Sequence, residues 1–443
     1  MYGGAGVCVK RNPFPGIALG ALSLTLGFLL AEAALHILNI PREQTSHQQL
    51  FVEYDSLLGW RNIPNGTGTI SSDEYVRRLT YNERSMRGPV LQYEKPAGTL
   101  RVLLLGDSFV DGYTENYGDR VSEVLERDLE TGTGLQVEVI PMGTGGFSTD
   151  QELLWLRSEG LKYDPDVVVL MFHPNDVWYS ISERYWRGSK PRFVIDGGAL
   201  RLTNVPVPPP DSAEDRSVSL GRRANRWIRE NSKIYWLVAR AAQNNPRFYG
   251  MAVRLGLTTP SPEMVFDAKS GTVVAGEFSV FAASPPPETR EAWRVTRELI
   301  RAMREETRAT GAEFLTFLIP VRSRIYTQFD DVRIGLGAGN ADIDVDAVVR
   351  QFDSMCITHS LPYIDPTTAF LTAADSLAAL NQRLYYRYDW HWNAKGHELA
   401  GQLLARYVRP LLRERQLHGE AGGFSSAVRQ TCGSLTPPIG FIH

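Results

Sequence analysis

The sequence predicts an α/β fold built on a doubly wound parallel sheet. Short, almost continuous apolar runs recur along the chain, and they have the length of strands that are buried on both faces; residues 101–105 and 166–171 are the clearest. Segments with helical spacing of apolar residues lie between these runs. Strands that alternate with helices imply right-handed βαβ crossovers, which place the strands parallel in one sheet.

Each element of this sheet can be assigned a range. The expected strands are residues 101–105, 136–140, 166–171, 314–319 and 361–364. The expected helices cover residues 121–129 and 153–161 and the stretch that holds Trp293, Leu299, Ile300 and Met303. The third strand and the fourth are far apart in the chain, so a long segment must leave the sheet between them.

The chain of 443 residues is long enough for one large domain with an insertion. Two proline clusters, at residues 206–210 and 285–287, bracket the stretch where the strand and helix pattern breaks. The expected segments are a cytoplasmic N-terminus (1–13), a transmembrane segment (14–40), a polar leader that wraps the core (41–98), the α/β domain (99–412) with its Pro-rich insertion (about 179–287), and a C-terminal tail (413–443).

The N-terminal apolar run predicts a membrane anchor. Residues 14–31 are apolar over about the minimum length of a spanning helix, and Glu32 lies near the far end. Lys10 and Arg11 precede the run, which puts the short N-terminus in the cytoplasm and the rest of the chain outside it, in the periplasm or beyond the cell. A cleaved signal peptide is the alternative, because residues 31–33 offer small residues at the required spacing. The length of the run favours a retained anchor.

Charge and cysteine content exclude several classes of partner. The net charge is −3 with no long basic run, so we expect no nucleic-acid partner. Only three cysteines occur, and no Cys/His cluster has the spacing of metal ligands, so we expect neither metal nor cofactor. Cys356 and Cys432 could form a disulfide outside the cytoplasm, or remain separate thiols.

Two short motifs carry the chemistry. Gly106-Asp107-Ser108 ends the first expected strand, and the carboxyl edge of a parallel sheet is where such folds place their active sites. Far along the chain, Asp389 and His391 supply a base for a serine and a carboxylate to orient that base. Two residues at this spacing point in opposite directions on a helix, so the segment is expected to be extended or turned.

Taken together, these motifs resemble the GDSL/SGNH hydrolase family. The first block of the family matches residues 106–109, and the second, which supplies a glycine, is similar to residues 139–147 with Gly146 as the matching glycine. The third block, with its Asn-Asp pair, matches residues 173–176. The last block, with Asp, His, Asn and Gly-His, matches residues 389–397. Four blocks in the family's order are far more specific than any one of them.

The resemblance implies a fold and a set of roles. It implies the flavodoxin-like SGNH hydrolase fold, in a membrane-anchored bacterial type, with Ser108 as nucleophile, His391 as base and then acid, and Asp389 orienting His391. It also implies an oxyanion hole formed by the backbone N–H groups of Ser108 and Gly146 and the side-chain amide of Asn175. His173 and His397 are expected to be structural.

The spacing of the last block suggests a substrate. Only Trp390 separates Asp389 from His391, where most members of the family have two residues, and Pro141 stands where many have Asn. The shorter form is similar to that of relatives that handle O-acyl groups on bacterial polysaccharides. We therefore expect a serine esterase that hydrolyses O-acyl esters, acetyl esters first, on a carbohydrate. The alternatives are an O-acyltransferase to a cell-surface polysaccharide and a non-catalytic glycan-binding or export-assembly module.

A cluster of aromatic residues follows Asn175 and allows two interpretations. The cluster consists of Trp178, Tyr179, Tyr185 and Trp186. Aromatic faces at the mouth of a site suit sugar rings, whereas the same residues could simply pack the insertion.

Overall fold

The computed structural model describes residues 14–40, 47–185, 188–210, 227–228, 231–243, 264–267, 272–327 and 344–421. The chain divides into two compact units. One consists of Met1–Gln44 and Ser212–Ala241, and the other of Thr45–Asp211 and Ala242–His443. All predicted site residues belong to the larger unit, which is described first.

The larger unit is built on a five-stranded sheet in the order β15-β14-β7-β5-β6, in which every neighbouring pair is parallel. The strands are β5 (Thr99–Gly106), β6 (Gln136–Gly143), β7 (Val167–Phe172), β14 (Glu313–Leu318) and β15 (Tyr363–Ile364). All five coincide with the predicted ranges to within two or three residues, so the prediction of a parallel α/β sheet is confirmed.

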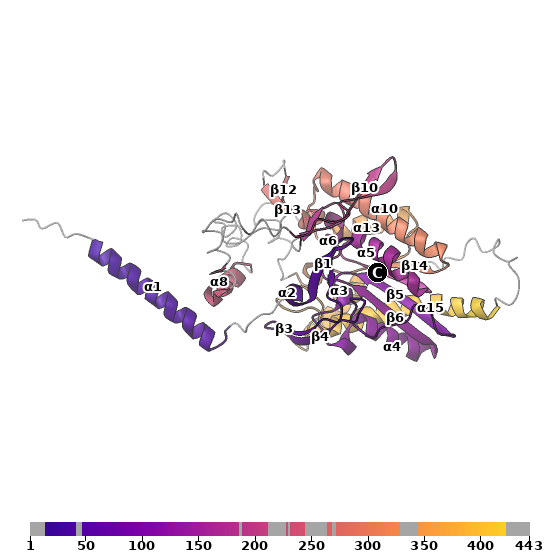
Figure 1. The fold of residues 1–443 in the computed structure, drawn as a ribbon, viewed down its shortest axis with the longest axis horizontal. Coiled ribbons are helices and arrows are strands. Elements are labelled where there is room, and N and C mark those ends of the chain that lie inside the picture. Colours follow the sequence, from indigo (N-terminus) through magenta and orange to yellow (C-terminus); the bar gives the residue numbers. More distant parts are fainter. Residues whose placement is uncertain are drawn as a thin grey trace, which may run out of the picture. The chain divides into compact units, whose positions relative to one another are not determined.

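Helices cover both faces of this sheet (Figure 1). Because side chains alternate along a strand, Leu103 and Leu105 of β5 pack into one buried cluster, and Val102 and Leu104 pack into another. The first cluster is completed by α5 (Thr149–Ser158), α10 (Pro287–Ala309) and α13 (Ala347–Thr358). The second is completed by α4 (Val121–Thr133), α14 (Thr367–Ala378) and α15 (Ala394–Ala421). A doubly covered sheet explains why its strands are apolar throughout.

Short helical turns follow the strands at their carboxyl ends. They are α3 (Ser108–Asp111) after β5, α6 (Asn175–Tyr179) after β7, and α11 (Arg322–Ile325) after β14, with the 3-10 turns η1 (Tyr117–Asp119) and η2 (Gly160–Tyr163) elsewhere. The helix predicted for residues 153–161 is divided in the structure. It ends at Ser158, because Glu159 leaves the helical region with a φ of −135°, and η2 follows.

The leader contains a short helix and two antiparallel hairpins. These are α2 (His47–Phe51), β1 (Val52–Asp55) with β2 (Gly59–Asn62), and β3 (Thr67–Ser71) with β4 (Val76–Thr80). Trp60 packs into the main core, but Phe51, Leu79 and Tyr81 belong to a small hydrophobic cluster of the leader itself. Tyr113 and Tyr386, which belong to the α/β domain, pack against this small cluster. The strands of the leader are short and half exposed, which left no recognisable apolar run.

The described residues of the insertion include three small hairpins. They are β8 (Arg184–Tyr185) with β9 (Gly188–Ser189), β10 (Arg192–Asp196) with β11 (Ala199–Thr203), and β12 (Met264–Asp267) with β13 (Thr272–Ala275), followed by the 3-10 turn η4 (Gly276–Phe281). The first hairpins are fixed to the core by Lys190. Its buried ammonium group pairs with the buried Asp150 carboxylate and donates to Tyr179 O at 2.8 Å.

The smaller unit contains α1 (Phe14–Ile37) and most of α8 (Lys233–Gln243). The Glu32 side chain accepts hydrogen bonds from the backbone N–H of Lys233 at 2.5 Å and of Ile234 at 3.1 Å, at the start of α8. A helix thus forms within the range predicted for the anchor. Among the residues described, however, no helix has both the length and the apolar character needed to cross a membrane. The membrane span predicted for residues 14–40 is not confirmed.

The C-terminal helix α15 is longer than expected, since it runs through Pro410 to Ala421 and includes the first residues of the predicted tail. The rest of that tail, with Cys432, lies outside the described residues. Cys356 is a buried free thiol on α13, and burial raises its pKa.

Candidate active site

Ser108 stands at the carboxyl edge of the sheet as the first residue of α3. The Asp107 carboxylate caps this short helix by accepting a hydrogen bond from Phe109 N at 2.9 Å. Gly106 is required at the junction, because a Cβ there would lie 2.5 Å from Val110 Cγ2. Phe109 and Val110 are buried, whereas Ser108 is half buried. The Ser108 hydroxyl therefore points away from the core.

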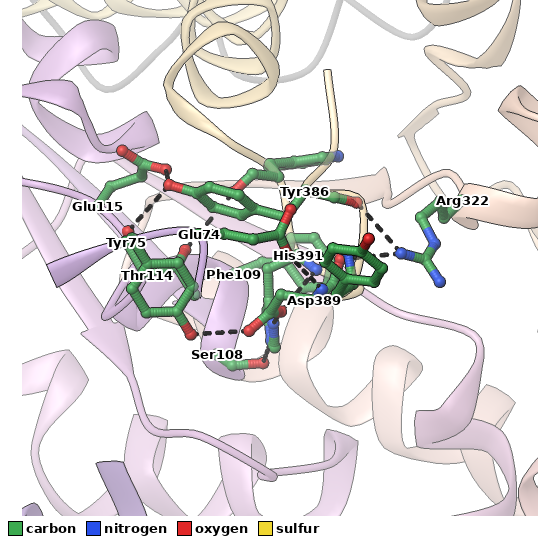
Figure 2. A network of polar contacts seen from close by, with 12 residues as sticks. Glu74, Tyr75, Ser108, Phe109, Thr114, Glu115, Arg322, Tyr386, Asp389 and His391 are labelled. Carbon is green, nitrogen blue, oxygen red and sulfur yellow. Dashed lines mark hydrogen bonds and ion pairs between the residues drawn. The ribbon is translucent and has the colours of Figure 1, made fainter. Parts of the chain in front are cut away.

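The structure brings Ser108, His391 and Asp389 together (Figure 2). Ser108 Oγ lies 2.7 Å from His391 Nε2, and His391 Nδ1 is hydrogen-bonded to Asp389 Oδ1. The residues at positions 389 and 391 can face each other because His391 N also donates to Asp389 Oδ1, at 3.1 Å. This is the turn that aspartate side chains form with the backbone two residues on, and it agrees with the predicted turned segment.

The electrostatics of the pair favour an ionised Asp389. Burial would raise the pKa of Asp389, but the charge of His391 and the hydrogen bonds from His391 and Tyr75 outweigh it and lower the pKa to about 2. Burial has the opposite effect on the His391 imidazole and lowers its pKa. The Asp389 carboxylate outweighs this effect and raises the pKa of His391 above 6.5. The imidazole can thus accept a proton readily while its carboxylate stays charged.

The two further residues assigned to an oxyanion hole follow the neighbouring strands. Gly106 at the end of β5 is in register with Gly143 of β6 and Met171 of β7, so the segments after all three strands start from one edge. Gly146 adopts a φ of +79°, which favours glycine, and Asn175 begins α6. The role of Gly146 and Asn175 as oxyanion donors stays a prediction.

The two histidines expected to be structural have such contacts. His173 Nδ1 lies 2.6 Å from Asn175 Oδ1, and its ring stacks on Phe109. When Nδ1 carries the proton, this contact holds the Asn175 oxygen and leaves the amide nitrogen facing the other way. His397 Nδ1 accepts a hydrogen bond from Val121 N at 3.3 Å, and burial lowers its pKa to about 3, so it acts as a neutral acceptor.

The loop that carries the Asp–His pair is held on two sides by charged side chains (Figure 2). The Glu74 carboxylate accepts hydrogen bonds from three successive backbone N–H groups, of Arg387, Tyr388 and Asp389, at 2.6 to 2.9 Å. The Arg322 guanidinium donates to three backbone oxygens of the same loop at 2.9 to 3.1 Å, those of Tyr386, Arg387 and Asp389. Sequence reasoning missed both side chains. The position of Arg322, just after a parallel strand, was the one available indication.

The aromatic cluster after Asn175 lies mainly inside the protein. Trp178 and Tyr179 are buried, and Tyr185 stacks on Trp60 at 5.7 Å between ring centroids. The interpretation as packing of the insertion holds for Trp178 and Tyr179, and the interpretation as a sugar-binding face is wrong for these two, whereas Tyr185 is half buried. Trp186 lies outside the described residues. Two aromatic residues of the catalytic loop are exposed instead, Tyr388 at 46% and Trp390 at 49%.

Buried acids lie close to the site and interact electrostatically with one another. Burial raises the pKa of Asp107, and burial together with the charges of Asp107 and Asp150 raises the pKa of Glu152 well above its usual value. Neither carboxylate oxygen of Glu152 has a hydrogen-bond partner. Within the described ranges, no group of three or more His, Cys, Asp or Glu side chains could hold a metal ion.

We expect the Glu152→Gln variant to be more stable than the parent at pH 8. A carboxyl group whose pKa is raised by folding stabilises the fold below its unfolded pKa, and this contribution is lost as the pH rises through the folded value. A glutamine cannot ionise, so Tm at pH 8 should increase by about 2 °C or more, with little gain at pH 5. Thermal unfolding at both pH values measures this. The matched control is Glu130→Gln, at an exposed position of α4, and equal gains for both variants would contradict the explanation.

Comparison with known families agrees with this geometry. The model of the GDSL-like lipase/acylhydrolase family matches residues 104–336, slightly more than half of the chain, and includes Ser108, Gly146 and Asn175. The model of the SGNH hydrolase-like domain of the acetyltransferase AlgX matches residues 281–436, which include Asp389 and His391. None of the curated proteins matches the chain.

Several solved structures are similar to the chain at low identity. An acetyl xylan esterase, AlAXEase, is 13% identical with a TM-score of 0.33, over 69% of this chain and 99% of its own. A lipase/acylhydrolase from Enterococcus faecalis is 14% identical with a TM-score of 0.31, over 70% and 96%. TesA is 11% identical with a TM-score of 0.34, over 70% and 99%. TM-scores this low support no argument about activity, and the assignment depends on the family model, which covers more than half of the chain: the protein belongs to the GDSL-like lipase/acylhydrolase family.

Proposed function

We propose that the protein is a serine esterase of the SGNH type that hydrolyses O-acyl esters, acetyl esters first, on a carbohydrate. The observation that carries the proposal is the pair of contacts from Ser108 Oγ to His391 Nε2, at 2.7 Å, and from His391 Nδ1 to Asp389. A serine hydroxyl is a weak nucleophile at neutral pH, and an adjacent base oriented by a carboxylate activates it. Membership of the family supports ester hydrolysis as the reaction.

In the acylation half, Ser108 Oγ attacks the ester carbonyl carbon while its proton passes to His391 Nε2. The Asp389 carboxylate stabilises the imidazolium that forms. The carbonyl oxygen becomes an oxyanion, to which we assign three donors: the backbone N–H groups of Ser108 and Gly146 and the Asn175 amide. The tetrahedral intermediate then expels the alcohol oxygen, which takes the proton from His391. The acyl group remains on Ser108.

In the deacylation half, water takes the place of the alcohol. His391 Nε2 removes a proton from the water as its oxygen attacks the acyl carbon, and the same donors bind the second oxyanion. When this intermediate collapses, Ser108 Oγ leaves and recovers the proton from His391. The products are a carboxylic acid and the free enzyme.

An O-acyltransferase is the second candidate, and the match to the AlgX acetyltransferase domain over residues 281–436 favours it. The acylation half is identical. In the second half a sugar hydroxyl, in place of water, loses its proton to His391 and attacks the acyl carbon. The two candidates therefore differ only in the acceptor.

The test is hydrolysis of p-nitrophenyl acetate by the full-length chain and by its Ser108→Ala variant, with Ser376→Ala on an exposed helix position as the control. We expect Ser108→Ala to lower kcat at least about 10³-fold. A fluorophosphonate probe should label the parent and the control but not Ser108→Ala.

The outcomes separate the three candidates. Turnover that depends on Ser108 supports the esterase. Labelling of Ser108 with little turnover, and acetyl transfer to an added oligosaccharide detected by mass spectrometry, would support the transferase. If the parent shows no turnover and Ser108 is not labelled, a non-catalytic glycan-binding or export-assembly module is left.

Trp390 supports the choice of a carbohydrate substrate. It is exposed and stands between the two loop residues of the triad, with its ring 5.8 Å from that of Phe278 and the Arg322 guanidinium 6.0 Å from its centroid. With the Arg322 guanidinium over this ring, its remaining exposed surface can pack against a sugar ring.

We expect Trp390→Ala to raise KM for an acetylated oligosaccharide about tenfold, a loss of about 1.4 kcal/mol. With p-nitrophenyl acetate, which has no sugar, kcat/KM should change less than twofold. Trp390→Phe should restore part of the affinity because it keeps an aromatic face. Trp227→Ala removes another exposed tryptophan and serves as the control. An equal loss with both substrates would mean that Trp390 supports the loop and does not bind sugar.

The cellular location is also proposed from the sequence. The apolar run at residues 14–31, preceded by Lys10 and Arg11, supports a single-pass anchor with the esterase outside the cytoplasm. Carbonate extraction of membranes, followed by protease treatment of intact spheroplasts, tests both parts. Release of the chain by carbonate would argue against the anchor, and protection from the protease would argue against the outside location.

A further inference from the structure

The turn of the β3–β4 hairpin in the leader reaches the catalytic loop. Residues 72–75 join the two strands, and the Ser72 hydroxyl accepts hydrogen bonds from Glu74 N and Tyr75 N, both at 3.1 Å. The Ser72 side chain thereby fixes the backbone of the two residues that follow. Glu74 and Tyr75 each make a polar contact to a residue more than 300 positions along the chain.

Tyr75 touches the carboxylate of the triad directly. Its hydroxyl donates to Asp389 Oδ2 at 2.7 Å, whereas His391 is bound to Oδ1 of the same group. Tyr75 is only 8% exposed, and its ring packs against Tyr386 at 5.0 Å between centroids. Each oxygen of the Asp389 carboxylate therefore has its own donor, and the group cannot rotate without losing one of them.

Glu74 holds the backbone beneath that carboxylate. It accepts hydrogen bonds from three consecutive backbone N–H groups. The last of these donors is Asp389 N itself, 2.9 Å from Glu74 Oε2. Arg322 holds the carbonyl groups of the same loop from another element. A loop outside regular structure would otherwise leave these groups to water. One carboxylate and one guanidinium replace a regular hydrogen-bond ladder here.

The leader also holds the nucleophile side of the site. The Tyr81 hydroxyl donates to Asp111 Oδ1 at 2.9 Å, and Arg87 donates to Glu115 O at 3.1 Å. Asp111 is the last residue of α3, the helix that Ser108 begins. One stretch of leader, residues 74–87, thus contacts both the element that carries the serine and the loop that carries the histidine and aspartate.

We propose that Glu74 and Tyr75 are positioning residues of the triad, and that the leader is part of the active site although it precedes the residues matched by the family model. Tyr75 fixes the Asp389 carboxylate, and Glu74 fixes the backbone that carries it. The short spacing of Asp389 and His391 explains why the triad would need such positioning residues. A pair joined through a single residue has little freedom to adjust, so its orientation is set from outside. The inference rests on the proposed esterase activity.

The first test is the Tyr75→Phe variant of the full-length chain, with p-nitrophenyl acetate as substrate. Loss of a hydrogen bond to a charged group should lower kcat about tenfold with KM within twofold. The acid limb of kcat/KM should move as well, because it reports the pKa of His391, which depends on where the Asp389 charge lies. Tyr93→Phe is the matched control, since it removes a tyrosine–carboxylate contact of 2.6 Å, to Glu159, elsewhere in the leader.

An unchanged acid limb and an unchanged kcat in Tyr75→Phe would overturn the role of Tyr75. Equal effects in Tyr75→Phe and Tyr93→Phe would do so too, because they would indicate a general loss of stability. A double variant removes the remaining ambiguity: if Tyr75 acts through Asp389, adding Tyr75→Phe to Asp389→Asn should lower kcat less than twofold. Fully multiplicative losses would overturn the proposal.

Glu74→Ala tests the backbone contact. Three N–H groups lose their acceptor, and we expect kcat to fall about tenfold or more, with partial rescue in Glu74→Gln, which keeps one acceptor oxygen. Glu53→Gln, in the other leader hairpin, is the control, since Glu53 pairs only with a surface arginine, Arg61. If Glu74→Ala and Glu53→Gln behave alike, Glu74 is no positioning residue. Failure of the proposed function looks different: Ser108→Ala would then retain the activity of the parent.

Discussion

Asp389→Asn should lower kcat about 10³-fold or more, with little change in KM. In the parent, His391 Nδ1 donates to Asp389 Oδ1, which directs Nε2 toward Ser108. The asparagine has one donor end and one acceptor end. Tyr75 and His391 contact different oxygens of the Asp389 carboxylate, so the amide nitrogen of an asparagine would replace one of these two acceptors. The imidazole therefore loses its orientation and the charge that stabilises its protonated form.

The pH dependence of kcat/KM provides an independent measurement. His391 must be neutral to accept the serine proton, and Asp389 raises its pKa above 6.5. The parent should thus lose activity as the pH falls through a value above 6.5, and the same limb should lie at lower pH in Asp389→Asn. Asp375→Asn, at an exposed position of α14, controls for the loss of a surface charge. An acid limb that stays in place in Asp389→Asn would mean that the pair does not govern the reaction.

Arg322→Met should cost both stability and activity. The guanidinium is nearly buried and holds three backbone oxygens of the catalytic loop. A methionine of similar length fills the space but donates nothing, so these oxygens lose their partner. We expect the free energy of unfolding to fall by about 3 kcal/mol and kcat to fall about 100-fold, because the loop also positions His391. Urea denaturation and steady-state kinetics measure the two effects.

The control for Arg322→Met lies on the same short helix. Arg324 pairs with the exposed Asp346 carboxylate at 2.6 Å, and a surface ion pair of this kind contributes less than about 1 kcal/mol. Arg324→Met should leave kcat unchanged. Arg322→Lys should recover part of the stability, since an ammonium can serve some of the carbonyls but not all three with the same geometry. If Arg322→Met loses stability but keeps its activity, the contacts of Arg322 with the loop are not needed for catalysis.

The sheet and the triad could be predicted from the sequence for the same physical reason. Strands buried on both faces must be apolar along their whole length, so β5 and β7 stand out as runs, and a parallel sheet brings the residues after them to one edge. Ser108 follows such a run directly. Asp389 and His391 were recognisable because their chemistry depends on residue type and close spacing.

Glu74, Tyr75 and Arg322 could not be predicted in this way. Their role depends on which segments meet in the folded chain, and the contact between Tyr75 and Asp389 joins residues 314 positions apart. The leader hairpins that carry two of them are short and half exposed, so they left no periodic pattern. The aromatic residues Trp178 and Tyr179 show the reverse case. Residue type allowed either a sugar-binding face or packing of the insertion, because burial is decided by tertiary packing, and packing placed both residues inside.

The order of the triad along the chain has a consequence for biosynthesis. Ser108 leaves the ribosome 283 residues before His391. Until then the hydroxyl has no base beside it, and a serine without its base is an ordinary alcohol. The growing polypeptide is consequently inert toward esters while these 283 residues are made, and the enzyme gains its reactivity only when His391 has been made and the domain has folded.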